Sequence, residues 1–140
     1  MQADSVAPGG SERVLLVDDE ESIVRVMTRM LERLGFRATG CESADEALDK
    51  LREDPGGGFD VVVTDLTMPD MTGLELALRI QEAWPRMPVI LCTGYGDGEL
   101  PDLDTTPPGI HKILHKPVRV QHLVAAIREV VRDVRSAETG

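Results

Sequence analysis

Four short apolar runs, each followed by polar residues, constrain the fold of this chain more than any other feature. Short β-branched runs bounded by turn residues are typical of strands buried on both faces of a parallel sheet. In an open parallel sheet the ligand crevice lies outside the carboxyl ends of the strands. The sequence therefore predicts that three carboxylates, one hydroxyl and one ammonium group meet at one edge of a sheet, where they can hold a divalent cation and a phosphoryl group. The runs and the residues after them are Val14–Val17 with Asp18 and Asp19, Val61–Val63 with Thr64 and Asp65, Val89–Cys92 with Thr93, and Ile110–His115 with Lys116 and Pro117.

Helical patterns alternate with these runs. The spacing of apolar residues predicts helices over about 21–34, 43–53, 72–84 and 120–134, and a further strand near 36–41. Gly35 stands where a C-terminal cap belongs, and Ser43 with Glu46 and Thr72 with Glu75 match the capping box. Alternating strands and helices with right-handed crossovers predict an α/β fold, a doubly wound five-stranded parallel sheet.

The segment between Asp97 and Gly109 is the weakest of the predicted helices. It contains Pro101, Pro107 and Pro108, and a proline inside a helix costs about 3 kcal/mol. We therefore expect the fourth helix to be short or irregular, with at most one or two turns.

Length and composition favour one domain. A chain of 140 residues fits a single compact domain, which we place at residues 12–134, between disordered tails at 1–11 and 135–140. No apolar run approaches the roughly 18–20 residues of a membrane span, so no membrane insertion is expected. The first residues lack the basic start and apolar core of a signal peptide, which favours a cytoplasmic location.

The charge balance argues against nucleic acid as a direct partner. The chain carries 15 basic and 25 acidic residues, a net charge of −10, without a cluster of Lys and Arg in the sequence that would neutralise phosphates. Cys41 and Cys92 stand alone in apolar surroundings and are expected to be small buried hydrophobes. The three histidines lack a ligand pattern for zinc.

Taken together, these motifs resemble the receiver domain of two-component response regulators. The resemblance runs from about Arg13 to Val134 and rests on Asp18-Asp19, on Asp65 in the segment Asp-Leu-Thr-Met-Pro-Asp-Met-Thr-Gly, on Thr93, and on Lys116-Pro117. It implies a flavodoxin-like fold with strand order 2-1-3-4-5. It also implies that the Lys116–Pro117 peptide bond is cis.

The resemblance implies a role for each site residue. Asp65 would be the nucleophile that takes a phosphoryl group from the phosphohistidine of a histidine kinase or histidine phosphotransfer protein. Asp18, Asp19 and Asp65 would hold Mg²⁺ together with the backbone carbonyl of Thr67, with Asp19 bonding the ion directly and Asp18 largely through water. Lys116 would offer its charge and Thr93 its hydroxyl to the phosphate. The domain would catalyse its own phosphorylation and slow dephosphorylation as a signalling domain rather than a metabolic enzyme.

The sequence departs from the receiver pattern at three points. Ile113 stands where the family usually has an aromatic switch residue, which puts the coupling between that ring and Thr93 in doubt. The proline-rich fourth segment disturbs the face that many receivers use for dimerisation, and we expect no output domain after the last helix. We therefore expect a monomer that acts through a partner protein. The segment Thr93-Gly-Tyr-Gly96 resembles receivers of hybrid sensor kinases.

Each residue alone also has a structural interpretation. Asp18 and Asp19 could be acids favoured at a helix N-terminus, Asp65 could cap a turn, Thr93 could end a strand, and Lys116 could be a solvated loop residue. Their occurrence together at four strand ends favours the functional interpretation. Two alternatives stay open. One is a pseudo-receiver that serves as an interaction module. The other is a magnesium-dependent phosphatase of the haloacid dehalogenase type, although Thr67 occupies the position where those enzymes need a second aspartate.

Overall fold

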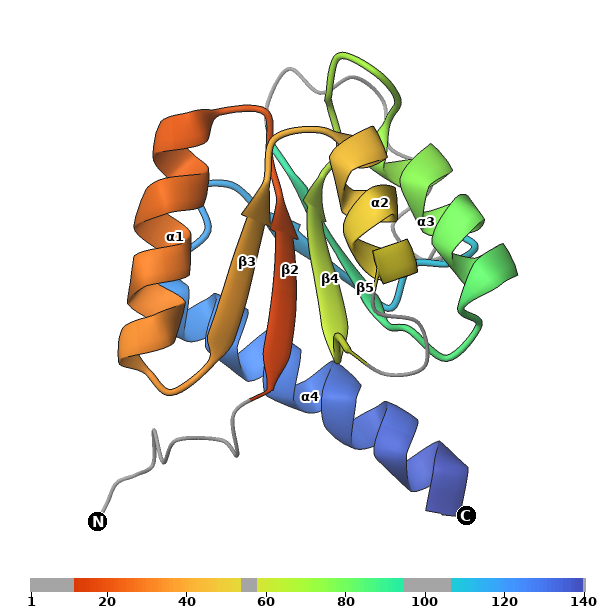
Figure 1. Cartoon of the computed structure of the whole chain (residues 1–140). Coiled ribbons are helices and arrows are strands. Elements are labelled where there is room, and N and C mark those ends of the chain that lie inside the picture. Colours follow the sequence, from red (N-terminus) through yellow and green to blue (C-terminus); the bar gives the residue numbers. More distant parts are fainter. Residues whose placement is uncertain (1–11, 54–57, 95–106, 140) are drawn as a thin grey trace, which may run out of the picture.

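The structure, a computed structural model, describes residues 12–53, 58–94 and 107–139 and contains one parallel sheet in that part of the chain. Its spatial order is β3-β2-β4-β5-β6, which is 2-1-3-4-5 in chain order, so the predicted doubly wound, flavodoxin-like fold is confirmed (Figure 1). The carboxyl ends of all five strands meet at one edge, the upper edge in Figure 1. The strands are β2 (Arg13–Val17), β3 (Arg37–Cys41), β4 (Val61–Asp65), β5 (Val89–Thr93) and β6 (Lys112–His115).

Helices cover both faces of the sheet, because alternate residues of the inner strands point to opposite sides. On β2, Leu15 and Val17 face α2 (Ala44–Glu53) and α3 (Gly73–Ala83). Val14 and Leu16 face α1 (Glu21–Arg33) and α4 (Val120–Thr139). Each face therefore has its own hydrophobic core, and β4 and β5 are buried along their whole length between the two.

The helix ends explain where the chain turns back to the sheet. Gly35 ends α1 with a φ of 97°, and the N–H groups of Gly35 and Phe36 donate to the carbonyls of Glu32 and Leu31. Thr72 and Glu75 form the predicted capping box at α3. At α2 only half of the predicted box forms. The Glu46 N–H donates to Ser43 Oγ at 3.1 Å, but Glu46 Oε1 accepts from the N–H of Glu42 at 3.0 Å.

Helix α4 corrects one predicted boundary. It continues to Thr139, so the helix does not end near Val134 as predicted. The physical reason is that residues 135–138 contain no glycine or proline, and the first helix-breaking residue is Gly140. Most of the predicted fourth helix, up to residue 106, lies outside the described residues. Pro107–Ile110 form a turn, in which the Ile110 N–H donates to the Pro107 carbonyl at 3.1 Å.

None of the helices in the described ranges is both long enough and apolar enough to cross a membrane.

Candidate functional site

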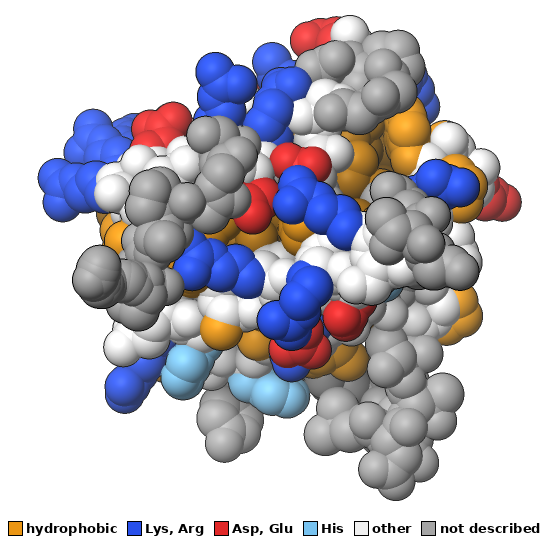
Figure 2. All heavy atoms as spheres, turned by 90° about the horizontal axis from the view of Figure 1, so that it is seen from below, with side chains coloured by type: hydrophobic (Ala, Val, Ile, Leu, Met, Phe, Trp, Pro, Cys, Tyr) orange, Lys and Arg blue, Asp and Glu red, His pale blue; other side chains and the backbone are white. Residues whose placement is uncertain are grey.

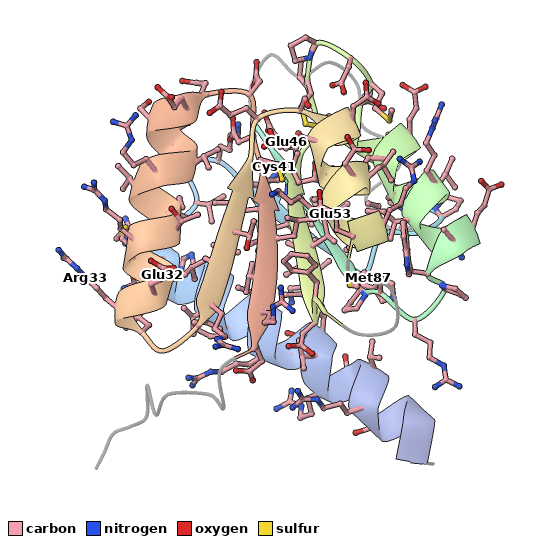
Figure 3. All side chains as sticks on the ribbon, in the orientation of Figure 1. Glu32, Arg33, Cys41, Glu46, Glu53 and Met87 are labelled. Carbon is pink, nitrogen blue, oxygen red and sulfur yellow. The ribbon has the colours of Figure 1, made fainter. Side chains whose placement is uncertain are left out.

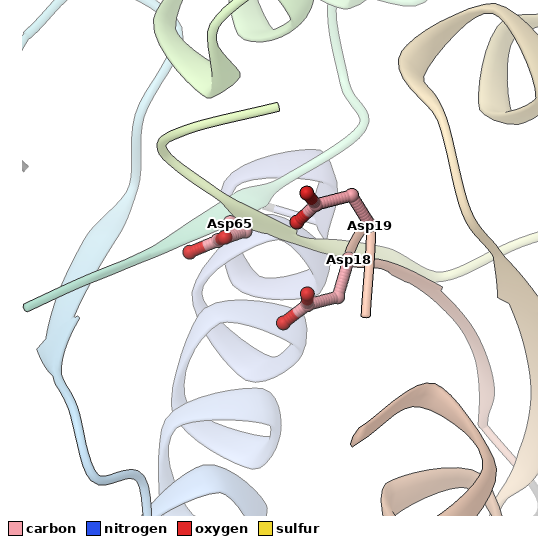
Figure 4. A group of neighbouring side chains, drawn as sticks. All are labelled: Asp18, Asp19 and Asp65. Carbon is pink, nitrogen blue, oxygen red and sulfur yellow. The ribbon is translucent and has the colours of Figure 1, made fainter. Parts of the chain in front are cut away.

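Three carboxylates lie together at the carboxyl ends of β2 and β4. Val17 pairs with Thr64 in the sheet, so Asp18 and Asp65 leave neighbouring strands at the same level. One carboxylate oxygen each from Asp18, Asp19 and Asp65 lies within 4.8 Å of the others (Figure 4). Asp18 and Asp65 are buried, whereas Asp19 is exposed. The arrangement concentrates negative charge at a place that one small cation can bridge.

The Lys116 ammonium group completes this cluster. Its Nζ atom lies 2.7 Å from Asp65 Oδ1 and 3.8 Å from Asp18 Oδ2. Lys116 follows β6, where its N–H donates to the Thr93 carbonyl at 2.6 Å, and the Lys116–Pro117 bond is cis as predicted. Gly94 leaves room for the lysine stem, since a Cβ atom at Gly94 would lie 3.2 Å from Lys116 Cβ. Two neighbouring strand ends thus direct Lys116 toward Asp65.

Asp18 is held in a conformation that costs electrostatic free energy. Its Oδ1 atom accepts a hydrogen bond from the N–H of Glu20 at 2.9 Å. Burial raises the pKa of Asp18 above its usual value, and the charges of Asp65 and Asp19 raise it further, although the Glu20 N–H and the Lys116 ammonium act in the opposite direction. Burying like charges together is unfavourable unless a cation or a proton joins them.

Two threonines lie near Asp65, Thr93 on the neighbouring strand and Thr67 in the loop that follows Asp65. Asp65 pairs with Cys92, so Thr93 is the next residue along β5 and is 1% exposed. Thr67 lies in the loop after Asp65, and its side chain is exposed. Thr64 also contacts this loop. Its hydroxyl donates to the Asp65 carbonyl at 3.0 Å and lies 3.8 Å from Met68 Sδ. The sequence placed Thr64 at this strand end but did not reveal this role.

Asp70 is a second residue that sequence reasoning missed. It lies in the loop between β4 and α3, and its carboxylate accepts from the N–H groups of Asp45 at 2.9 Å and Ala44 at 3.3 Å. Burial by itself would raise the pKa of Asp70, but these backbone donors, with those of Asp70 and Met71, lower it overall. Asp70 therefore ties the loop after Asp65 to the start of α2. The partners are separated by 25 and 26 residues, so no local pattern could reveal them.

A mostly apolar cleft of about 610 Å³ opens beside the carboxylates. Asp18, Asp65 and Lys116 lie at its polar end. Its walls come from α1 and from the segment between β6 and α4. The side chains at these walls include Ser22, Ile23, Val26, Met27, Pro117 and Val118.

Both cysteines are buried and free, as the sequence predicted. Cys41 ends β3 beside α2, where Figure 3 marks it near Glu46. Burial, and to a smaller extent the charge of Glu46, raises the pKa of Cys41 to about 12. Burial also raises the pKa of Cys92 to about 12, with the charge of Asp65 adding to the effect. Both groups are therefore neutral thiols at physiological pH.

Comparison with known proteins identifies the family. The family model described as "Response regulator receiver domain" matches residues 14–128. The chain belongs to the response regulator receiver family. The receiver matches the response regulator receiver protein CpdR of Brucella abortus with 33% identity over 121 residues, which cover 86% of this chain and 97% of CpdR. Other curated relatives are longer, and the receiver spans 29%, 18% and 50% of three of them.

Solved structures agree with this assignment. A receiver domain protein from Clostridium thermocellum superposes with a TM-score of 0.79 at 31% identity, over 90% of this chain and 98% of the other. The response regulator TrrA from Thermotoga maritima, solved in complex with Mg²⁺ and BeF, superposes with a TM-score of 0.72 at 28% identity, over 85% of this chain and 98% of the other.

Proposed function

We propose that this receiver accepts a phosphoryl group on Asp65 from the phosphohistidine of a histidine kinase or histidine phosphotransfer protein. The observation that carries the proposal is the 2.7 Å contact between Lys116 Nζ and Asp65 Oδ1, within a cluster that also contains Asp18 and Asp19. A buried carboxylate beside two others and an ammonium group can gain a dianionic substituent only where its charge is compensated. Lys116 supplies part of this compensation, and a divalent cation held by the three carboxylates would supply the rest.

The transfer needs positioning more than chemical activation. A carboxylate oxygen of Asp65 attacks the phosphorus atom, and the bond between phosphorus and the imidazole nitrogen of the donor breaks. The electron pair of that bond stays with the imidazole, which then takes a proton. Lys116 shifts from the free carboxylate to an oxygen of the transferred group, and the Thr93 hydroxyl donates to another. Hydrolysis of the resulting acyl phosphate returns the domain slowly to its starting state.

The donor set fits Mg²⁺ as the cofactor. Carboxylate and carbonyl oxygens are the ligands that this hard cation takes, and Asp18, Asp19 and Asp65 offer one oxygen each within 4.8 Å of one another. Asp18, Asp19 and Asp65 would hold the ion, with the backbone carbonyl of Thr67 as a further ligand. When bound, it neutralises the charge that develops on the transferred group. The presence of Mg²⁺ in the TrrA complex supports the same choice.

The cleft beside the carboxylates is where we place the donor protein. Ile23, Met27, Pro117 and Val118 all line it. An apolar helix face laid against α1 would bring a phosphohistidine to Asp65. We also propose a cytoplasmic location, which the sequence favours, and a role as a signalling domain rather than a metabolic enzyme.

Labelling with a small phosphodonor tests the proposal. Incubation with Mg²⁺ and acetyl phosphate should add the mass of one phosphoryl group, and the adduct should be labile at alkaline pH. The Asp65→Asn variant should stay unlabelled and Thr93→Ala should be labelled slowly. An unlabelled wild-type protein that still binds its partners would favour the pseudo-receiver, whereas full labelling of Asp65→Asn would exclude Asp65 as the acceptor.

A further inference from the structure

Arginines gather at the end of the molecule opposite the carboxylates. Arg13 and Arg37 start β2 and β3 and are paired in register, Arg86 precedes β5, and α4 adds three more at intervals of about one turn. Figure 2 views the molecule from this end, with basic side chains spread across the face and hydrophobic ones visible between them. We call this surface the arginine pole and define it as Arg13, Arg37, Arg86, Arg128, Arg132 and Arg135, which are six of the 15 basic residues of the chain.

Two adjoining hollows shape the arginine pole. One, of about 500 Å³, has an apolar wall that includes Phe59, Trp84, Met87 and Val134, with Arg86 and Arg135 at its rim. The other, of about 410 Å³, lies along α4 between Arg128, Arg132 and Arg135. The hollows share Val131 and Arg135 and therefore adjoin each other. The acids that line it are Asp60 and Glu12, against four arginines.

Three of the six arginines of the pole contact neighbouring side chains, and two of these are stacked on aromatic rings. The Arg13 guanidinium lies 4.6 Å from the ring centre of Phe59, and that of Arg128 lies 5.7 Å from the ring centre of Phe36. Arg135 is 3.9 Å from Asp60, a long contact between side chains that are 62% and 33% exposed. Such a surface pair adds little stability and can exchange for a better carboxylate. Stacking limits the rotamers of the other two, so less entropy is lost when they bind an anion.

We propose that the arginine pole binds an acidic peptide segment of a partner protein, with one large apolar side chain of that segment seated against Trp84 and Phe59. Guanidinium groups match carboxylates in geometry, and the apolar wall gives the segment an anchor that charge alone would not. A peptide fits better than a nucleic acid. The net charge of −10 repels a long polyanion, which extends beyond the arginines. A short acidic segment interacts mainly with charges within about 8 Å, the Debye length, because salt screens those farther away.

The pole lies at the opposite edge of the sheet from Asp65, so this binding is independent of phosphoryl transfer and leaves the cleft beside α1 accessible. A partner held at the pole can therefore be present while a kinase docks at the other end. The segment would contact residues from the start of β2 and β3, the loop before β5 and the second half of α4.

Fluorescence anisotropy with a defined probe tests the proposal. The probe is a short fluorescein-labelled peptide of glutamates around one central phenylalanine, added to the full chain at physiological salt. We expect saturable binding that weakens as salt is raised. The double variant Arg132→Glu/Arg135→Glu should weaken it by about tenfold, which corresponds to about 1.4 kcal/mol. Replacing the phenylalanine of the probe by alanine should also weaken it.

The matched control is Arg29→Glu, which reverses an exposed arginine on α1 that lines neither hollow and should bind the probe like the wild type. Circular dichroism and thermal unfolding establish that the variants are folded. The proposal is overturned by no saturable binding, or by equal weakening in Arg29→Glu. It is also overturned if a single-stranded oligonucleotide binds more tightly than the peptide and depends on the same two arginines, since that result assigns the pole to nucleic acid.

Discussion

Gly73 packs directly on the backbone of Asp65. A Cβ atom at Gly73 would overlap the Asp65 carbonyl oxygen and would lie 2.7 Å from Leu91 Cδ1. The Gly73 N–H also donates to the Leu66 carbonyl at 2.7 Å, which closes the loop between β4 and α3. The position of the proposed phosphoacceptor therefore depends on a residue without a side chain at the start of α3.

Gly73→Ala should both destabilise the fold and impair the site. Overpacking of this kind typically costs about 1–3 kcal/mol, and relief of the overlap must move the Asp65 backbone. We expect the melting temperature to fall by several degrees and the rate of labelling by acetyl phosphate to fall as well. Gly109→Ala is the matched control. It is strained by a φ of 83° and by the Ala77 backbone, so it should lose stability but keep normal labelling below its melting temperature. Equal labelling in both variants would contradict the argument.

Asp18→Asn should stabilise the metal-free protein at neutral pH. Burial and the neighbouring carboxylates raise the pKa of Asp18 above 3.8, so the folded state binds its proton more tightly than the unfolded chain. Stability of the wild type therefore decreases as the pH rises from 3.8 through the raised pKa. The variant escapes this loss, so its advantage in melting temperature should be largest near neutral pH and shrink toward pH 3.8. Unfolding in EDTA across this pH range measures it, and an advantage that grows on acidification would refute the assignment.

Most of the fold and the proposed site could be predicted because both depend on local patterns. The strands are continuous apolar runs, and a parallel sheet brings their carboxyl ends together whatever the loops do. Asp18, Asp65, Thr93 and Lys116 could therefore be placed at one edge from the sequence. The capping box of Thr72 and Glu75 is local in the same sense, since its partners lie three residues apart.

Features that depend on contacts between distant segments could not be predicted. Asp70 gives no sign in the sequence of its partners Asp45 and Ala44, which lie 25 and 26 residues away. The arginine pole is also invisible in the sequence. Arg13, Arg37 and Arg86 are isolated along the chain and become neighbours of α4 only when the strands align.

Asp70→Ala should lower stability by about 1 kcal/mol at neutral pH, the usual value of a lost helix cap. The pKa of Asp70 is held below 3.8 because backbone N–H groups bind the carboxylate more strongly than burial opposes it. Its contribution is therefore present above pH 3.8 and is lost as the pH falls through the lowered pKa. The deficit of the variant in chemical denaturation should shrink in that acidic range. Asp70→Asn keeps an acceptor oxygen and should lose less, and a deficit independent of pH would contradict this account.

Ile23→Glu should slow phosphoryl transfer from a phosphohistidine protein without affecting acetyl phosphate. Ile23 lines the apolar cleft, where a buried charge would oppose docking of an apolar helix face, but it is not among the carboxylates or Lys116. Met30→Glu is the matched control, because Met30 is 36% exposed on the same helix and does not line the cleft. Transfer is measured with radiolabelled donor. A parallel loss with both donors would indicate a misfolded variant, and normal transfer would show that the donor docks elsewhere.

We expect the protein to stay monomeric with and without phosphorylation. Many receivers couple the phosphorylated site to a dimerisation face through an aromatic residue near the end of the last strand, and β6 carries Ile113 at that position. Ile113 is partly buried against the core that α2 and α3 form with the sheet. An isoleucine has no aromatic ring that could turn toward Thr93. Pro101, Pro107 and Pro108 also favour a monomer, because prolines disfavour the fourth helix that many receivers use for dimerisation. Light scattering at micromolar concentration, with Mg²⁺ and beryllofluoride as the phosphoryl mimic, should give one protomer mass in both states, and Asp65→Asn provides the control that cannot respond. A dimer that forms only with beryllofluoride and is lost in Ile113→Ala would overturn the expectation, because it would show that an aliphatic residue at this position still transmits the signal.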